Sequence, residues 1–170
     1  RGARLGKFYL RSAATNVGKT RAMVGDACFI GCSQMWSLKE NKWVTTGACQ
    51  SVLFIATEQT LDEIQISAVA CISGVEEDHI VMHEYFTGEW ERIVKAKQLL
   101  KQSKIQFICM PDFSMDDVEN MIKKHIRENQ VEYVFFDYIH SSAKILTEIG
   151  GKSGVKNLRE DNILFLLASK

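Results

Sequence analysis

Apolar and polar residues alternate in blocks along the chain, and the apolar blocks are short. Four of them end at polar or turn residues: "GKFYL" (residues 6–10), "SVLFIAT" (residues 51–57), "IQFICM" (residues 105–110) and "VEYVFFD" (residues 131–137). Nearly continuous apolar runs of this length are typical of strands that are buried on both faces. They predict a buried sheet.

The segments between these runs are amphipathic and predict helices over residues 19–36, 60–73, 76–86, 88–103 and 114–129. In the first segment, Met23, Ala27, Ile30 and Met35 recur at helical spacing. Strands that alternate with helices in this way indicate an α/β domain. We therefore expect a mostly parallel sheet flanked by helices on both faces.

Two of the predicted helices carry clear start signals. Thr60 is followed by Glu63 three residues later, the pattern of a capping box. Ser114 precedes acidic residues in the first turn of the helix over 114–129. By contrast, residues 37–50 are polar and contain Asn41 and Gly47, so this segment predicts an excursion from the main fold, in the form of a hairpin.

The end of the chain has a different pattern. Residues 138–156 are rich in glycine and lysine and predict a loop. Residues 157–170 are ambiguous, because the apolar run over 163–168 fits a strand and the whole segment also fits a buried helix. No internal repeat or linker marks a boundary, so residues 1–170 predict a single domain.

Composition restricts the number of domains and the classes of protein that fit the chain. The chain has 170 residues, enough for one domain with a hydrophobic core. Its 21 basic and 21 acidic residues give no net charge, so any surface for nucleic acid has to be local. No apolar run reaches the roughly 18 residues of a membrane span, and no signal peptide is visible.

Five cysteines are scattered among apolar residues: Cys28, Cys32, Cys49, Cys71 and Cys109. Their odd number and the lack of a C-x-x-C pair argue against a disulfide framework or a zinc site. We interpret each of them as a core thiol in a reducing compartment, and we expect the protein in the cytoplasm.

The stretch "LRSAATNVGKTRAM" (residues 10–23) carries the main chemical signal. Gly18, Lys19 and Thr20 follow the first predicted strand and open a predicted helix, as in a phosphate-binding loop. Such a loop holds phosphates with backbone N–H groups and the helix N-terminus, a lysine and a hydroxyl for Mg²⁺. Ala13 stands where these loops usually have their first glycine.

Two acidic residues support this interpretation because each follows a predicted strand. Asp137 closes "YVFFD" and is placed to orient Mg²⁺ through water. Glu58 follows "VLFIAT" and is the candidate general base for an attacking water. In open parallel sheets, ligands bind at the carboxyl ends of the strands, where both acids are expected.

These motifs resemble the RecA-fold motor domain of DnaB-type replicative helicases. The stretches "SAATNVGKTRAM", "VLFIATEQTLDEIQISAVACISGV", "FTGEWERIVKAKQLL", "IQFICMPDFSMDDVENMIKKHIREN" and "VEYVFFDYIHS" occur in the order seen in that family. The family tolerates alanine at the first loop position, as at Ala13, and has an Asp-Tyr pair like Asp137-Tyr138. The resemblance extends over residues 5–170.

The resemblance implies an ATP-dependent DNA helicase that uses ATP and Mg²⁺. Glu58 and Lys19 would be catalytic, and Thr20 and Asp137 would hold the metal. The nucleotide would contact Ala13, Ala14, Thr15, Asn16, Val17, Gly18, Lys19, Thr20 and Arg21. The implied partners are single-stranded or forked DNA, five further copies in a homo-hexamer, and a primase or loader, with no membrane.

Several features depart from the family or remain open. His140 replaces a common glutamine, so it is either a γ-phosphate sensor or a structural or DNA-facing residue. Lys144, Lys152 and Lys156 either contact DNA or are ordinary solvated lysines. The polar segment over residues 37–50 is longer than usual and indicates a phage- or mobile-element-like branch.

By the family pattern, residues 157–170 form a helix, which would leave the domain incomplete at its C-terminus and without an arginine finger. The N-terminal collar domain of the family would also be absent. We expect such a fragment to be slow or inert in hydrolysis by itself. The alternative function is an ATP-dependent switch for DNA binding or assembly, like RecA-type recombinases and clock-type ATPases, without processive unwinding.

Overall fold

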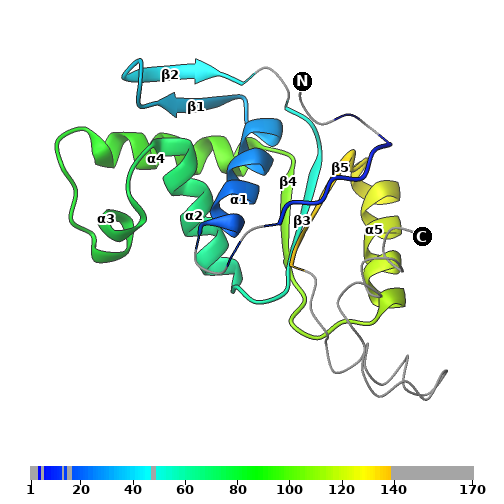
Figure 1. Ribbon diagram of the computed structural model, residues 1–170. Helices are drawn as coiled ribbons and strands as arrows, with labels where there is room; N and C mark the ends of the chain where they lie inside the picture. The colour runs from blue at the N-terminus through cyan, green and yellow to red at the C-terminus, as the bar shows by residue number, and fades with distance from the viewer. Residues whose placement is uncertain (1–3, 5, 13, 15–16, 47–48, 139–170) are drawn as a thin grey trace.

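The computed structural model describes residues 4, 6–12, 14, 17–46 and 49–138 (Figure 1). Its elements, in chain order, are α1 (Lys19–Gly31), β1 (Gln34–Ser37), β2 (Lys42–Thr45), β3 (Val52–Ala56), α2 (Leu61–Ser73), α3 (Glu77–Met82), α4 (Glu89–Gln102), β4 (Ile105–Cys109), α5 (Met115–Asn129) and β5 (Tyr133–Asp137). The predicted strands over 51–57, 105–110 and 131–137 are confirmed as β3, β4 and β5.

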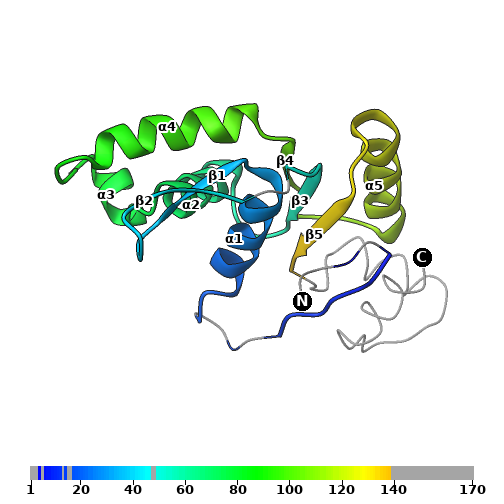
Figure 2. The same cartoon turned by 90° about the horizontal axis from the view of Figure 1, so that it is seen from above.

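These three strands form a parallel sheet in the order β4-β3-β5. Seen from above, α1, α2 and α4 lie on one side of the sheet and α5 lies on the other (Figure 2). The side chains of β3 alternate accordingly. Val52 and Phe54 join the cluster that includes α1 and α2, whereas Leu53 and Ile55 pack with Ile122 of α5. The predicted α/β sheet with helices on both faces is therefore present in the described residues.

The start signals at the two capped helices are also confirmed. The Thr60 hydroxyl accepts from the backbone N–H of Glu63, and the Glu63 carboxylate accepts from the N–H of Thr60. Ser114 and Asp117 make the same reciprocal pair at the start of α5. Each pair satisfies backbone donors that the first turn of a helix leaves free.

The predicted hairpin exists, but it begins earlier than expected. The helix predicted over 19–36 ends at Gly31, and Met35 and Trp36 belong to β1, opposite Val44 and Trp43 of β2. The Trp36 and Trp43 rings meet edge-to-face at 5.6 Å. This antiparallel pairing, together with packing against α2 and α4, stabilises a strand where the apolar spacing alone fitted a helix.

The strand predicted over residues 6–10 is wrong. Residues 7–12 have no regular structure, and Phe8, Tyr9 and Leu10 are each about 60% exposed. A strand requires ladder hydrogen bonds to a neighbour, and residues 7–12 make none with the rest of the described chain. Of the loop predicted over residues 138–156, the structure describes only Tyr138, and the ambiguous segment 157–170 lies wholly outside the described residues.

The cysteines only partly follow the prediction of core thiols. Cys28 and Cys32 are fully buried, and Cys71 and Cys109 are half-buried. Cys49 is exposed, because it lies in the connection between β2 and β3 rather than in an element that packs on the sheet. None of the described helices is long and apolar enough to cross a bilayer.

Candidate functional site

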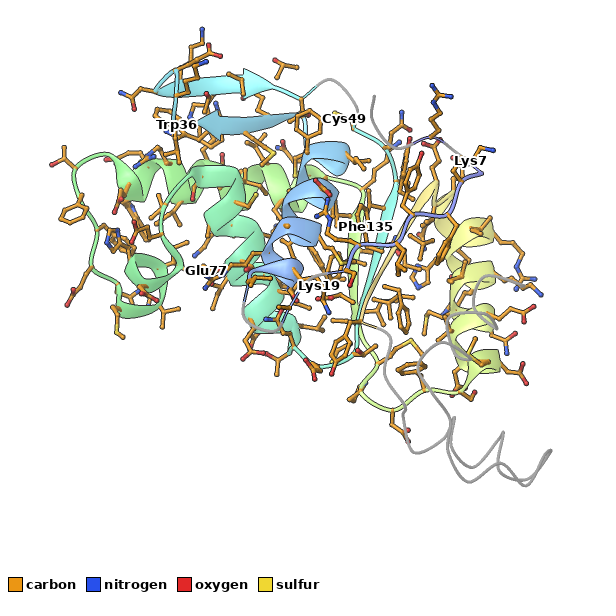
Figure 3. All side chains as sticks on the ribbon, in the orientation of Figure 1. Lys7, Lys19, Trp36, Cys49, Glu77 and Phe135 are labelled. Carbon is orange, nitrogen blue, oxygen red and sulfur yellow. The ribbon has the colours of Figure 1, made fainter. Side chains whose placement is uncertain are left out.

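The candidate site lies where β3 and β5 end and α1 begins. Ala56 and Asp137 are partners in the parallel ladder, so the two strands end at the same level. Glu58 follows β3 after Thr57, and Lys19 is the first residue of α1. Figure 3 shows Lys19 at the end of α1 that faces this edge of the sheet. The structure thus brings together Lys19, Glu58 and Asp137, as the sequence predicted.

Gly18 gives the turn into α1 its shape. Its φ of 82° places it in the left-handed region, which glycine enters without steric cost. The N–H groups of the first turn of α1 receive no side-chain cap at Gly18. Free N–H groups at a helix N-terminus favour an anion, so this end of α1 has the chemistry of a phosphate site.

Lys19 and Asp137 form the charged centre of the site. The Lys19 Nζ lies 3.8 Å from Asp137 Oδ1, and Asp137 is only 5% exposed. Within the described chain, Oδ1 of Asp137 is buried and accepts no hydrogen bond. A buried carboxylate oxygen without a partner is costly, and a bound cation or its water shell removes that cost. The residues present therefore fit a Mg²⁺–nucleotide complex.

Thr57 holds the ends of β3 and β5 together. Its backbone N–H donates to the carbonyl of Asp137 at 2.8 Å. Its hydroxyl donates to the carbonyl of Tyr138 and accepts from the Tyr138 N–H, both at 3.0 Å. Because Thr57 is 3% exposed and precedes Glu58, these bonds fix Glu58 relative to Asp137 and Tyr138.

Tyr138 contacts both Glu58, the candidate general base, and Lys19, the candidate phosphate ligand. Its hydroxyl donates to Glu58 Oε1 at 2.6 Å, and the Lys19 Nζ lies 4.2 Å from its ring centroid. No function was assigned to Tyr138 or Thr57 from the sequence. The Asp137-Tyr138 pair and a threonine before Glu58 were the available signals, but neither reveals a contact across 80 residues.

Arg21, in the first turn of α1, forms an ion pair with Glu77. Its guanidinium donates to the Glu77 carboxylate of α3 at 2.7 and 3.1 Å, and these hydrogen bonds to Glu77 raise the pKa of Arg21. Ser67 of α2 donates to the same carboxylate. Arg21 thus links α1 to α3, and its contact with a nucleotide stays a prediction.

The other predicted site residues are placed as follows. Thr20 is half-buried in the first turn of α1, and Ala14 and Val17 are exposed ahead of it. Several residues lie outside the described part of the chain: Ala13, Thr15, Asn16, His140, Lys144, Lys152 and Lys156. Their predicted roles in binding nucleotide or DNA remain predictions.

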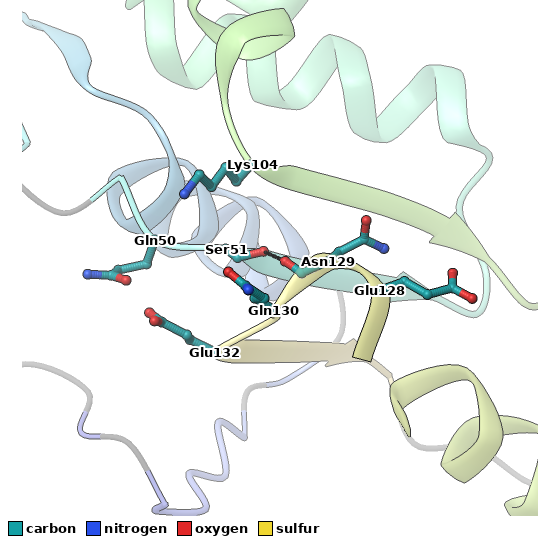
Figure 4. Close-up of a pocket in the computed structure, with 7 residues that line it drawn as sticks. All are labelled: Gln50, Ser51, Lys104, Glu128, Asn129, Gln130 and Glu132. Carbon is teal, nitrogen blue, oxygen red and sulfur yellow. Dashed lines mark hydrogen bonds between the residues drawn. The ribbon is translucent and has the colours of Figure 1, made fainter. Parts of the chain in front are cut away.

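A hollow of about 210 Å³ lies at the opposite, amino end of the sheet (Figure 4). It is lined by Gln50, Ser51, Lys104, Glu128, Asn129, Gln130 and Glu132. The Ser51 hydroxyl donates to the carbonyl of Asn129 at 2.9 Å. With its amide oxygen and nitrogen exchanged, Gln50 donates to the Glu132 carboxylate. The hollow contains no residue with a predicted function.

Comparison with known proteins agrees with this geometry. The model of the DnaB-like helicase C terminal domain family matches residues 1–158. The chain is 45% identical over 170 residues to the SPbeta prophage-derived uncharacterized protein YorI of Bacillus subtilis (strain 168). It spans 34% of that protein's length. The prophage origin of this relative agrees with the expected phage-like branch. The chain belongs to the family of DnaB-like helicase C-terminal domains.

Proposed function

We propose that this chain is the ATP-hydrolysing motor domain of a ring-forming replicative DNA helicase that unwinds duplex DNA. The observation that carries the proposal is the buried, unpartnered Oδ1 of Asp137 beside Lys19. Glu58 lies at the same edge of the sheet, joined to Lys19 through Tyr138. A cation, an anion-binding helix end and a carboxylate base in one place are what nucleotide hydrolysis requires.

Each side chain has a distinct role in binding. The backbone N–H groups after Gly18 and the Lys19 ammonium bind the phosphates of ATP. The Thr20 hydroxyl and Asp137, the latter through water, would hold Mg²⁺, which neutralises phosphate charge when it is bound. Movement of the Lys19 ammonium to a phosphate oxygen needs only rotation of its flexible side chain, because the contacts to Asp137 and Tyr138 are non-covalent.

Glu58 acts on water. It accepts a proton from a water molecule whose oxygen forms a bond to the γ-phosphorus, while the bond from that phosphorus to the bridging oxygen breaks. The products are ADP and phosphate, and Lys19 neutralises charge that develops on the phosphate oxygens. Glu58 suits this role because it is exposed at the strand end, where water reaches it.

The remaining components of the motor come from outside the described residues. A neighbouring subunit of a homo-hexamer would supply a cationic finger, and His140 would sense the γ-phosphate. Lys144, Lys152 and Lys156 would bind the phosphates of single-stranded DNA, since lysines on a loop neutralise phosphates without reading sequence. A primase or a loader would be the protein partner.

Replacement of Lys19 by alanine in the full-length protein tests the proposal. DNA-stimulated hydrolysis of ATP should fall by at least about 100-fold, because phosphate charge is no longer neutralised. Lys97→Ala, which removes an exposed lysine of α4 away from the site, is the matched control and should hydrolyse ATP normally. Unchanged hydrolysis in Lys19→Ala would refute the site.

A forked duplex separates a motor from an ATP-dependent switch. With a labelled fork and ATP, a motor releases the displaced strand at a rate that follows hydrolysis. A switch for DNA binding or assembly retains the fork intact while it consumes or merely binds ATP. Strand release by the unmodified protein and none by Lys19→Ala would support the motor.

A further inference from the structure

Tyr138 contacts both Lys19 and Glu58. We propose that Tyr138 is a positioning residue that orients Glu58 toward water and keeps it apart from Lys19. This inference rests on the proposed hydrolysis of ATP and adds a residue to it. Lys19 and Glu58 carry opposite charges at the same sheet edge, yet they form no ion pair with each other in the described structure.

The hydroxyl of Tyr138 fixes one end of the Glu58 carboxylate. The bond to Oε1 is short, at 2.6 Å, as expected for a hydroxyl that donates to a charged oxygen. An exposed glutamate otherwise samples several rotamers, and only some of them direct an oxygen toward a bound water. With Oε1 occupied by Tyr138, the second oxygen accepts no hydrogen bond from any described residue and remains available for water.

The backbone of Tyr138 is itself held firmly. Both its N–H and its carbonyl bond to the hydroxyl of Thr57, the residue directly before Glu58. The Tyr138 ring and the Glu58 side chain therefore project from two backbone segments that are tied together at a buried residue. Positioning of this kind is effective only when the supporting group is rigid.

The ring of Tyr138 keeps the Lys19 ammonium apart from the Glu58 carboxylate. The Lys19 ammonium lies over the ring face, 4.2 Å from its centroid, where it is attracted without a hydrogen bond. The hydroxyl on the same ring occupies the Glu58 oxygen. Without this ring, Lys19 and Glu58 would be free to neutralise each other, which would remove both the phosphate ligand and the base.

Tyr138→Phe tests the inference because it keeps the ring and removes only the hydroxyl. In the full-length protein, kcat for ATP hydrolysis should fall about tenfold, as expected for loss of a hydrogen bond to a charged group. KM and the affinity for Mg²⁺–ATP should stay within about twofold, since Lys19 keeps its contacts. Tyr85→Phe is the matched control: it removes another exposed tyrosine hydroxyl, bonded to His83 at 2.9 Å, and should leave both constants unchanged.

A second variant distinguishes positioning from general stability. Glu58→Asp shortens the side chain and draws the carboxylate away from the Tyr138 hydroxyl. In that background, Tyr138→Phe should change kcat by less than about twofold, because the interaction is already lost. A full tenfold additional loss would mean that Tyr138 acts independently of Glu58 and would overturn the inference.

The remaining outcomes separate this inference from the proposed function. If the unmodified protein hydrolyses ATP and Tyr138→Phe matches its kcat, Tyr138 has no positioning role and the proposed function stands. A loss of Mg²⁺–ATP affinity in Tyr138→Phe that equals its loss of kcat would make Tyr138 a binding residue and also overturn the inference. If the unmodified protein does not hydrolyse ATP, the proposed function fails and the inference fails with it.

Discussion

Gly31, the last residue of α1, lies directly against the side chain of Ile105 at the start of β4. A Cβ added to Gly31 would overlap the Ile105 Cγ1 and come within 2.8 Å of its Cδ1. Val52 Cγ2, at 3.5 Å, borders the same space. The close approach sets the end of α1 on the sheet, and the start of α1 carries Lys19. The packing of Gly31 and the position of the candidate site are therefore linked through one helix.

Gly31→Ala should destabilise the protein by about 1–3 kcal/mol, because the new methyl group overpacks the contact with Ile105. The measurement is urea unfolding followed by circular dichroism. Gly25→Ala in the same helix is the control. Its added Cβ would meet only Cys71 Sγ at 3.4 Å, so the gain in helix propensity should dominate, by about 0.5 kcal/mol. Equal effects of the two substitutions would contradict this description of the packing.

The capping box at the start of α2 should make stability depend on acid pH. The hydrogen bond from the Thr60 backbone N–H to the Glu63 carboxylate lowers the pKa of Glu63. A carboxyl whose pKa is lower in the folded state contributes stability above its unfolded pKa, and that contribution is lost as pH falls through the folded value. We expect Glu63→Gln to show a smaller loss of Tm than the unmodified protein between about pH 5 and pH 3.

At neutral pH, the same Glu63→Gln variant should be less stable than the unmodified protein, because glutamine is a weaker acceptor and lacks favourable charge near a helix N-terminus. The two Tm curves should therefore converge as the pH falls. Parallel curves would show that the Glu63 carboxylate does not contribute to the pH dependence.

The cysteines should differ sharply in their reaction with iodoacetamide. Hydrogen bonds with Cys32 and Cys71, together with burial, raise the pKa of the Cys28 thiol well above its usual value. Cys49 is exposed. Since the thiolate is the reactive form, Cys49 should be alkylated first in the folded protein, and Cys28 only after unfolding. Peptide mass spectrometry at several times gives the order, and Cys49→Ser should remove the fast phase.

The sequence predicted the strands and helices of the main sheet well, because their signals are local. Apolar runs define β3, β4 and β5, and serine or threonine with an acid three residues later defines the starts of α2 and α5. Glu58 and Asp137 were found because each follows a buried run, and parallel strands place such residues at one edge.

The incorrect predictions concern properties that depend on tertiary partners. Met35 and Trp36 fit a helical spacing, but pairing with Trp43 and Val44 makes them part of a strand. Phe8 to Leu10 are apolar enough for a strand, yet they make no ladder with the described residues. The bond from Tyr138 to Glu58 was missed because it joins residues 80 positions apart through the geometry of two strand ends.

We expect Asp137 to lower the stability of the ligand-free protein and to raise the stability of the protein bound to Mg²⁺–ATP. Its buried Oδ1 has no hydrogen-bond donor among the described residues, and the nearest cation, Lys19, is 3.8 Å away and 26% exposed. A buried charge with so distant a partner is poorly compensated. Without ligand, Asp137→Asn should therefore be as stable as the unmodified protein or more stable, by up to about 1 kcal/mol.

With Mg²⁺–ATP, the order of stability should reverse. The unmodified protein should gain Tm as the Mg²⁺–ATP concentration rises, since a ligand that binds only the folded state stabilises it. Asp137→Asn should gain much less, because the amide removes the negative charge that holds the metal. Asp26→Asn removes an exposed carboxylate that pairs with Arg11, and it should retain the full gain. Thermal unfolding with Mg²⁺–ATP, and with ATP plus a chelator, measures both effects. An equal gain for Asp137→Asn and the unmodified protein would exclude Asp137 from metal binding.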